Sequence, residues 1–213
     1  MLMENLRISL VQAGIVWENK LENLKNYGDL LQNVSGNSDL VVLPEMFSTG
    51  FSMQCCHLAE TNDGETISTI RKWAVDFNFA VAGSFLAKDA AGKLYNRGFF
   101  VTPEDDCFFY DKRHLFRMGN EHNLFVQGNK QLIIPYKGWN INFIICYDLR
   151  FPIWCRNVNN AYDLMLCPAN WPEVRDFAWE TLLKARAIEN QTYVCGVNRV
   201  GGIIMIKKRK RHQ

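Results

Sequence analysis

Three reactive residues stand just beyond short apolar runs of the sequence. Glu45 follows "DLVVLP", Lys112 follows "CFFYD", and Cys146 ends "WNINFIIC". Runs of this length and composition predict buried strands, and ligands of layered α/β proteins bind beyond the carboxyl ends of such strands. We therefore expect a sheet to hold all three side chains at the edge of a cleft.

A carboxylate, an amine and a thiol complement one another in acyl-transfer chemistry. A free thiol has a pKa of about 8.5, so Cys146 is mostly protonated at neutral pH and Glu45 can accept its proton. The Lys112 ammonium favours the thiolate and, with the backbone N–H of Tyr147, can stabilise an oxyanion. Protonated Glu45 can then protonate a departing amine and later activate water. These roles predict hydrolysis through a thioester on Cys146.

Each of these residues also has a simpler interpretation. A single cysteine is most often a small buried hydrophobe, and a glutamate or lysine beside a turn is most often surface charge. A Cys–His hydrolase with His114 or His122 as its base is an alternative, but Cys146 lacks the flanking glycines of a G-x-C-x-G elbow. A non-catalytic binding protein is a third interpretation, and the intact set of Glu45, Lys112 and Cys146 argues against it.

Longer segments around these residues resemble the three catalytic segments of the nitrilase superfamily, the carbon–nitrogen hydrolases. These segments are "LPEMFSTGFSM" (43–53), "YDKRHLFRMGNEH" (110–122) and "CYDLRFP" (146–152). Later segments, "ANWP" and "KARAIENQTYVCGVNRVG", are similar to the blocks that follow in the family. The resemblance implies a catalytic set of Glu45, Lys112 and Cys146. It also implies that a second glutamate, Glu121, positions the lysine or the substrate.

The residues of two segments resemble one branch of this superfamily in particular, the omega-amidases. "LPEMFSTGFSM" and "ANWPEVRDFAWETLLKARAIENQ" are similar to that branch. It implies hydrolysis of the terminal amide of 2-oxo dicarboxylic acid monoamides such as 2-oxoglutaramate and 2-oxosuccinamate, with release of ammonia and without a cofactor or metal. Hydrolysis of nitriles or of N-carbamoyl amino acids is the alternative within the family.

A wall of aromatic side chains is expected around the substrate. Phe51, Phe116, Trp171 and Tyr147 are the candidate substrate-binding residues, and core packing is an equally simple role for the first three. The group that binds a substrate carboxylate stays open.

Two arginines are candidates for binding the substrate carboxylate. Arg117 and Arg150 both lie within the similar segments. Arg150 could instead form a buried ion pair with Asp148 or Glu189.

The elements that must position these residues alternate between strand and helix. Strands are predicted at 6–12, 39–44, 79–87, 94–102, 107–111, 131–136, 139–146, 163–168 and 193–199, and helices after Asn19 and at 65–77, 152–159 and 175–190. Such alternation predicts an α/β fold. The resemblance implies an αββα sandwich that forms a homodimer through the helices that follow Cys146 and at 175–190.

The last segment of the sequence departs from the family pattern. The family continues through further strands after "NRVG", whereas this sequence reads "GIIMIKKRKRHQ". We therefore expect one hydrolase domain over 1–201 with its C-terminal strands missing, followed by an atypical basic tail at 202–213. The fold class expected is thus an αββα sandwich truncated at its C-terminus.

Composition argues against several other classes of protein. The chain has 213 residues, of which 48% are apolar, and no stretch approaches the roughly 18 apolar residues of a membrane span. Without the five bases of the tail, acids outnumber bases, so no nucleic-acid partner is expected. The seven cysteines contain no C-x-x-C pair, which weakens a zinc or redox interpretation. No signal peptide is recognised, so a cytoplasmic location is expected.

Overall fold

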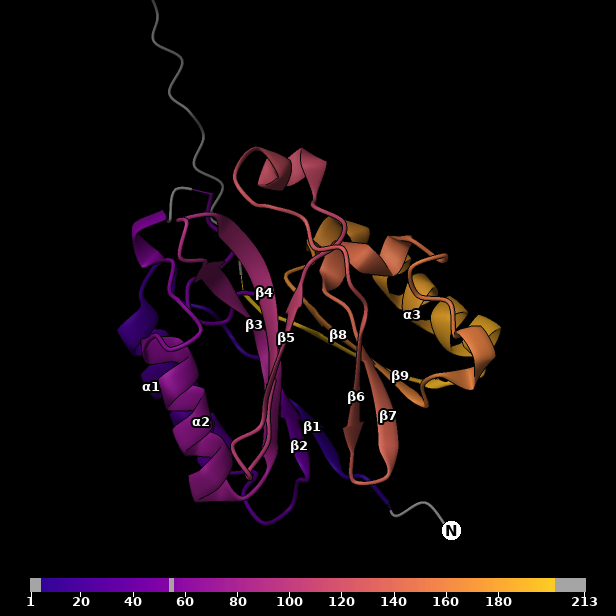
Figure 1. The fold of residues 1–213 in the computed structure, drawn as a ribbon, viewed down its shortest axis with the longest axis horizontal. Helices are drawn as coiled ribbons and strands as arrows, with labels where there is room; N and C mark the ends of the chain where they lie inside the picture. The colour runs from indigo at the N-terminus through magenta and orange to yellow at the C-terminus, as the bar shows by residue number, and fades with distance from the viewer. Residues whose placement is uncertain (1–4, 54–55, 202–213) are drawn as a thin grey trace, which may run out of the picture.

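Two β-sheets lie face to face, and helices cover the outer side of each sheet (Figure 1). The computed structural model describes residues 5–53 and 56–201. The predicted αββα sandwich is therefore confirmed. The basic tail at 202–213 lies outside the described residues.

The first sheet has the strand order β1-β2-β3-β4-β5. Its strands are β1 (Ile8–Leu10), β2 (Leu40–Val42), β3 (Ala80–Lys88), β4 (Leu94–Val101) and β5 (Cys107–Asp111). The first three are parallel and the last two are antiparallel. Helices α1 (Lys20–Gln32) and α2 (Glu65–Phe77) pack on its outer face.

The second sheet has the strand order β6-β7-β8-β9. Its strands are β6 (Leu132–Tyr136), β7 (Trp139–Phe143), β8 (Leu164–Ala169) and β9 (Tyr193–Asn198). The pair β6–β7 is antiparallel, and β7, β8 and β9 are parallel. Helix α3 (Asp176–Asn190) covers the outer face (Figure 1).

Alternation of side chains along the strands builds two separate apolar layers. In β2, Val41 packs with the cluster under α1 and α2, whereas Leu40 and Val42 pack between the sheets. The sheets approach closely at Gly98, where an added Cβ would lie 2.4 Å from the Phe143 ring. The two sheets are therefore in direct contact beneath the residues predicted to be reactive.

Local signals account for the predicted helix start and hairpin. The Asn19 side chain caps α1 by accepting a hydrogen bond from the Glu22 N–H at 3.2 Å. Between β3 and β4, the Asp89 carboxylate accepts hydrogen bonds from the N–H groups of Ala91 and Lys93, both at 2.9 Å. These side chains fix the ends of the elements as the sequence predicts.

Two predictions about the region around Cys146 are wrong. The segment 152–159 forms turns and only a short 3₁₀ turn at Val158–Asn160 instead of a helix, because Asn159 and Asn160 adopt left-handed backbone angles. The strand that leads to Cys146 ends at Phe143, earlier than predicted. It ends there because the Ile145 N–H donates to a side chain, that of Asp148, instead of to a neighbouring strand.

Candidate active site

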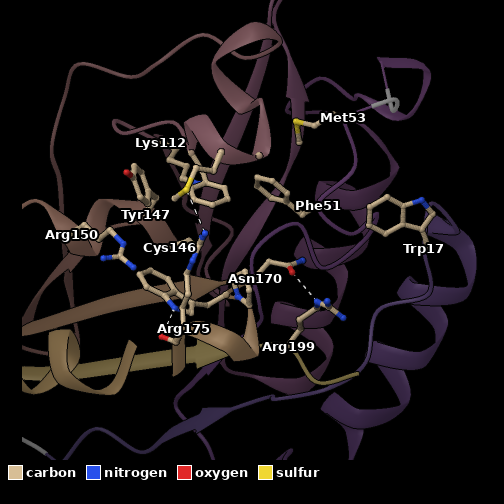
Figure 2. A pocket seen from close by; sticks show the side chains of 15 residues that line it. Trp17, Phe51, Met53, Lys112, Cys146, Tyr147, Arg150, Asn170, Arg175 and Arg199 are labelled. Atoms are coloured by element: carbon tan, nitrogen blue, oxygen red, sulfur yellow. Dashed lines mark hydrogen bonds between the residues drawn. The ribbon is translucent and has the colours of Figure 1, made fainter. Parts of the chain in front are cut away.

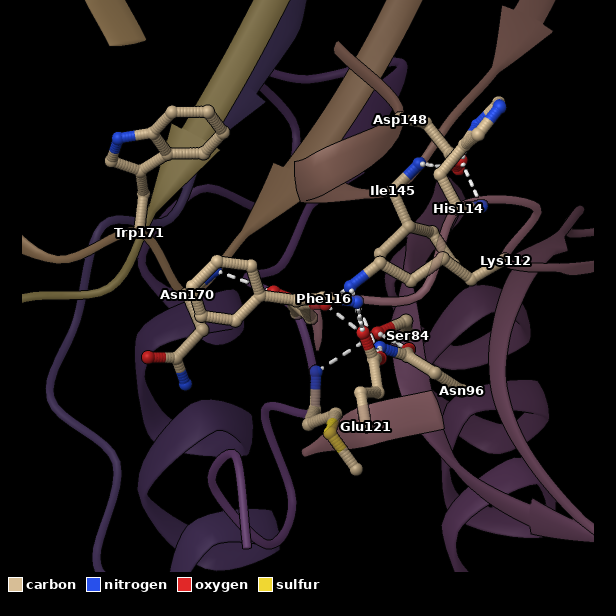
Figure 3. Close-up of polar contacts among 12 residues, drawn as sticks. Ser84, Asn96, Lys112, His114, Phe116, Glu121, Ile145, Asp148, Asn170 and Trp171 are labelled. Atoms are coloured by element: carbon tan, nitrogen blue, oxygen red, sulfur yellow. Dashed lines mark hydrogen bonds and ion pairs between the residues drawn. The ribbon is translucent and has the colours of Figure 1, made fainter. Parts of the chain in front are cut away.

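A buried cluster of charges joins Glu45, Lys112 and Glu121. The Lys112 Nζ donates to Glu45 Oε1 at 2.8 Å and to Glu121 Oε2 at 2.9 Å. Asn96 Nδ2 donates to the same Glu45 oxygen at 2.7 Å and to Glu121 Oε1 at 2.8 Å (Figure 3). All of these side chains are buried, so one ammonium and one amide hold two carboxylates in a fixed arrangement.

Both sheets fix the position of Glu45. Its N–H donates to the Ala169 carbonyl at 3.3 Å, and its Oε2 accepts from the Asn170 N–H at 2.9 Å. Ala169 and Asn170 come from the end of β8 in the second sheet, while Glu45 follows β2 in the first. The carboxylate is therefore held where the two sheets meet.

A short chain of hydrogen bonds sets the orientation of Asn96. The Met46 N–H donates to Ser84 Oγ at 2.9 Å, and that hydroxyl donates to Asn96 Oδ1 at 3.0 Å. Because the amide oxygen is occupied in this way, the Asn96 nitrogen faces Glu45 and Glu121. Sequence reasoning missed both Ser84 and Asn96, which lie within strands and have no motif of their own.

Lys112 is an ammonium at neutral pH. Burial acts to lower its pKa, but the charges of Glu121 and Glu45, together with that of a Cys146 thiolate, raise the pKa well above its usual value. Burial also raises the pKa of Glu121, against the opposing effect of Lys112. Lys112 can therefore stabilise negative charge, but it cannot act as a base.

Cys146 begins a 3₁₀ turn, Cys146–Arg150, with a left-handed φ of 46°. Its side chain is nearly buried, with 7% of the residue surface exposed. Burial and then the negative charge of Glu45 raise the pKa of this thiol well above its ordinary value, although Lys112 opposes them. The resting group is a thiol, so its attack on a substrate requires a base that accepts the proton.

Cys146 and Lys112 line one cavity of about 260 Å³. Its wall includes the predicted substrate-binding residues Phe51, Phe116, Tyr147 and Trp171 (Figure 2). Phe116 packs edge-on against both Phe51 and Tyr147. The aromatic residues of the prediction therefore gather on one surface, next to the reactive thiol.

Three arginines also line this cavity, namely Arg150, Arg175 and Arg199. Arg150 lies with its guanidinium carbon 4.9 Å from the centre of the Trp171 ring. The other candidate, Arg117, is exposed and is absent from the cavity wall. Sequence reasoning missed Arg175 and Arg199, although both stand in segments that it quoted as similar to the family.

The ion pairs suggested for Arg150 are wrong. Glu189 pairs instead with Arg186, at 2.8 Å. Asp148 accepts hydrogen bonds from Tyr110 and His114. The guanidinium of Arg150 thus remains available on the cavity side.

Neither histidine of the alternative interpretation lines the cavity with Cys146. His114 Nδ1 lies 2.9 Å from Asp148 Oδ1, and its ring stacks on Phe151 at 3.6 Å between centres. His122 is exposed. The Glu45 carboxylate, in contrast, is close enough to Cys146 for its charge to raise the pKa of that thiol.

Metal-binding clusters and membrane-spanning helices would indicate other classes of function. Over 5–53 and 56–201, no group of three or more His, Cys, Asp or Glu residues could hold a metal ion. No helix in the same part of the chain has the length and apolar character needed to cross a bilayer.

Comparison with known proteins finds one family. The family model described as Carbon-nitrogen hydrolase matches residues 7–213. Omega-amidase YafV of Escherichia coli (strain K12) is 44% identical over 199 residues, which cover 93% of this chain and 76% of that protein. The 2-oxoglutaramate amidase of Bacillus subtilis (strain 168) is 30% identical over 91% of this chain and 76% of its own length.

A solved structure is similar over the same region. It is that of XC1258 from Xanthomonas campestris, described as a CN-hydrolase superfamily protein with an arsenic adduct in the active site. It is 46% identical and has a TM-score of 0.91, with 93% of this chain and 77% of that chain covered.

Proposed function

The chain belongs to the carbon–nitrogen hydrolase family, and from this premise we propose that it is an omega-amidase. It hydrolyses the terminal amide of small 2-oxo dicarboxylic acid monoamides, such as 2-oxoglutaramate and 2-oxosuccinamate, and releases ammonia. The observation that carries the proposal is that Lys112 and Cys146 line one aromatic cavity, while Glu45 lies 2.8 Å from the Lys112 ammonium and close enough to Cys146 to raise the pKa of its thiol. The names of the two amidases similar to this chain support the choice of substrate.

In the first half of the reaction, the Cys146 sulfur attacks the amide carbon while Glu45 accepts the thiol proton. The carbonyl oxygen becomes an oxyanion, which the Lys112 ammonium and the backbone N–H of Tyr147 stabilise. The tetrahedral intermediate collapses with cleavage of the C–N bond. Glu45 returns its proton to the departing nitrogen, so ammonia leaves and a thioester remains on Cys146.

In the second half, water attacks the thioester carbon and Glu45 accepts one of its protons. The C–S bond then breaks, the carboxylic acid leaves, and the proton returns to Cys146. Glu121 holds Lys112 through both steps, since its two oxygens lie 2.9 and 3.1 Å from Nζ.

The cavity wall favours a substrate that carries a carboxylate. We assign the substrate carboxylate to Arg150, whose guanidinium lies on the Trp171 ring. Within the residues that the structure describes, Arg150 forms no ion pair that would compete for this anion. Phe51, Phe116 and Tyr147 exclude water from the remainder of the substrate.

A homodimer is the proposed assembly, formed through α3 and the segment before β8. The supporting observation is a group of exposed apolar side chains on this side of the molecule. They are Ile153, Val174, Phe177 and Ile188, with 90%, 91%, 86% and 77% of their surfaces exposed. Light scattering after size-exclusion chromatography tests the proposal: Phe177→Glu should convert a dimer into a monomer, and a wild-type monomer would contradict it.

Ammonia release on a panel of substrates tests the activity. The panel contains 2-oxoglutaramate, 2-oxosuccinamate, glutamine, asparagine, a simple nitrile and an N-carbamoyl amino acid. We expect the two 2-oxo acid amides to be hydrolysed fastest. A preference for the nitrile or the N-carbamoyl compound would replace omega-amidase by another activity of the family.

The matched variants Cys146→Ser and Cys167→Ser test the nucleophile. Both thiols are buried, and Cys167 lies in β8 without access to the cavity wall. Cys146→Ser should abolish turnover, because a serine hydroxyl is much harder to deprotonate. If instead Cys167→Ser abolishes turnover and Cys146→Ser retains it, the thiol is wrongly assigned.

A further inference from the structure

The Asp148 carboxylate is fully buried two residues beyond Cys146 and accepts four hydrogen bonds. Its Oδ2 accepts from the Tyr110 hydroxyl at 2.7 Å and from the Ile145 N–H at 3.1 Å. Its Oδ1 accepts from the His114 N–H at 2.7 Å and lies 2.9 Å from His114 Nδ1. Four bonds fill the acceptor capacity of a carboxylate, so this group is fully engaged.

These four bonds join the two loops that carry Lys112 and Cys146, and Figure 3 shows those from Ile145 and His114. Ile145 directly precedes Cys146, just beyond the end of β7 in the second sheet. Tyr110 and His114 stand two residues before and two residues after Lys112, which follows the first sheet. One carboxylate therefore fixes the chain on both sides of the lysine and just ahead of the cysteine.

The backbone at Cys146 needs such support. Its φ of 46° is unfavourable for a residue other than glycine, and such angles persist only where surrounding contacts impose them. The Asp148 carboxylate accepts a hydrogen bond from the N–H of Ile145, the residue before Cys146. In return, the Asp148 N–H donates to the Ile145 carbonyl at 3.0 Å. The turn is therefore closed from both directions around the cysteine.

The partners of Asp148 are themselves fixed by packing. The His114 ring stacks on Phe151 with an interplanar angle of 8°. The Tyr110 hydroxyl, which donates to Asp148, accepts from Trp154 Nε1 at 2.9 Å. A buried carboxylate is costly unless it is well bonded, and this one is bonded to groups that cannot move away.

We propose that Asp148 is a positioning residue that sets the Cys146 sulfur relative to the Lys112 ammonium across the junction of the two sheets. The inference rests on the proposed function, because it matters only if these two groups react with one substrate. Asp148 does not line the cavity, so it acts through Cys146 and Lys112 and does not touch the substrate.

Replacement of Asp148 by asparagine is a defined perturbation. If the new amide nitrogen takes the place of Oδ2, it faces the Ile145 N–H, and if it takes the place of Oδ1, it faces the His114 N–H. In either orientation two donors meet and one backbone bond is lost. The lost bond adjoins either the cysteine or the lysine loop, so both orientations disturb their relative position.

The experiment compares D148N with a matched control, Asp163→Asn. Asp163 also accepts a backbone hydrogen bond, from Asn140 at 2.9 Å, but at the opposite end of β7. For D148N we expect kcat on 2-oxoglutaramate to fall roughly 100-fold, as small displacements of reacting groups do, with KM little changed. Alkylation of Cys146 by iodoacetamide should change in rate as well, whereas D163N should match the wild type in both measurements.

A second variant keeps the test decisive if D148N fails to fold. Tyr110→Phe removes one bond to Oδ2 and leaves both backbone bonds, so an intermediate loss of kcat, about tenfold, is expected. If folded D148N, or failing that Tyr110→Phe, keeps the wild-type kcat and alkylation rate, Asp148 serves only stability and the proposal is wrong. Failure of the proposed function is a different result: the wild type itself would not hydrolyse 2-oxoglutaramate.

Discussion

Replacement of Glu45 by glutamine removes the capacity of this side chain to accept a proton but keeps its size and shape. In the wild type, Oε1 accepts from Lys112 and Asn96, and Oε2 accepts from the Asn170 N–H. An amide nitrogen at either place faces a donor, so Glu45→Gln loses at least one of these bonds as well as its charge. It also loses the capacity to accept a proton from Cys146.

The expected size of each effect follows from these contacts. Loss of a general base reduces kcat by roughly 100-fold or more, which corresponds to about 2.7 kcal/mol in the barrier. Loss of a buried hydrogen bond costs about 1–3 kcal/mol of unfolding free energy. The cost stays in this range because Glu121 continues to pair with Lys112 at 2.9 Å. For a chain of this size we expect Tm to fall by roughly 2–12 °C, so the variant is folded at 25 °C.

Two assays then distinguish catalysis from thiol reactivity. Steady-state ammonia release from 2-oxoglutaramate should collapse in Glu45→Gln. Alkylation of Cys146 by iodoacetamide at neutral pH should not become slower, because the Glu45 charge raises the pKa of that thiol and its removal leaves the opposing effect of Lys112. A residue that served only to hold the fold would reduce both rates together.

Glu60→Gln is the matched control. Glu60 also binds a lysine, Lys20 at 2.8 Å, and a backbone N–H, that of Thr66 at 3.3 Å, but it does not belong to the cluster of Glu45, Lys112 and Glu121. Its replacement should leave kcat unchanged. The reasoning is refuted if folded Glu45→Gln keeps kcat within about tenfold of the wild type, or if His114→Ala is the more damaging change.

Three further predictions concern the cavity, acid stability and the contact between the sheets. Arg150→Leu should raise KM for 2-oxoglutaramate and leave the hydrolysis of a neutral amide unchanged; equal effects on both substrates in steady-state kinetics would remove its assignment to the carboxylate. Hydrogen bonds from Arg7 hold the pKa of Asp39 below its usual range, so Asp39 stabilises the fold above its unfolded pKa of about 3.9 and loses this contribution as pH falls. Urea titrations of Asp39→Asn should therefore show lower stability at neutral pH and a shallower decline on acidification; a decline parallel to that of the wild type would contradict this. Gly98→Ala should lower Tm, at a cost of about 1–3 kcal/mol, because its Cβ would meet the Phe143 ring at 2.4 Å; an unchanged melt would show that the sheets can part there.

The sequence singles out Glu45, Lys112 and Cys146 because each stands beside a strong local pattern. The apolar runs before these residues form strands of the two sheets; Lys112 and Cys146 line one cavity, and Glu45 Oε1 lies 2.8 Å from Lys112 Nζ. The helix predicted at 152–159 does not form, and Asn159 and Asn160 at its end adopt left-handed angles that composition does not fix. Local pattern thus predicts the strands of the two sheets better than it predicts the short segment that connects β7 to β8.

The supporting groups could not be predicted in this way, because their partners are distant in the sequence. Asn96 meets Glu45 from a separation of 51 residues, and the Asn170 N–H meets it from 125 residues away. Such contacts depend on how the sheets are placed against each other. The same holds for Asp148, for which the sequence suggested an arginine partner and the fold supplies Tyr110 and His114.

The division of the site between the sheets explains why these distant contacts matter. The first sheet carries Glu45 and Lys112, and the second sheet carries Cys146. In the proposed reaction, attack on the amide and departure of ammonia need the base and the ammonium together, so neither sheet alone would present a working site. The Glu45–Asn170 and Asp148–His114 contacts cross this junction and therefore bear on reactivity as well as on stability. Substitutions that shift one sheet against the other should reduce kcat even where they lie far from the cavity.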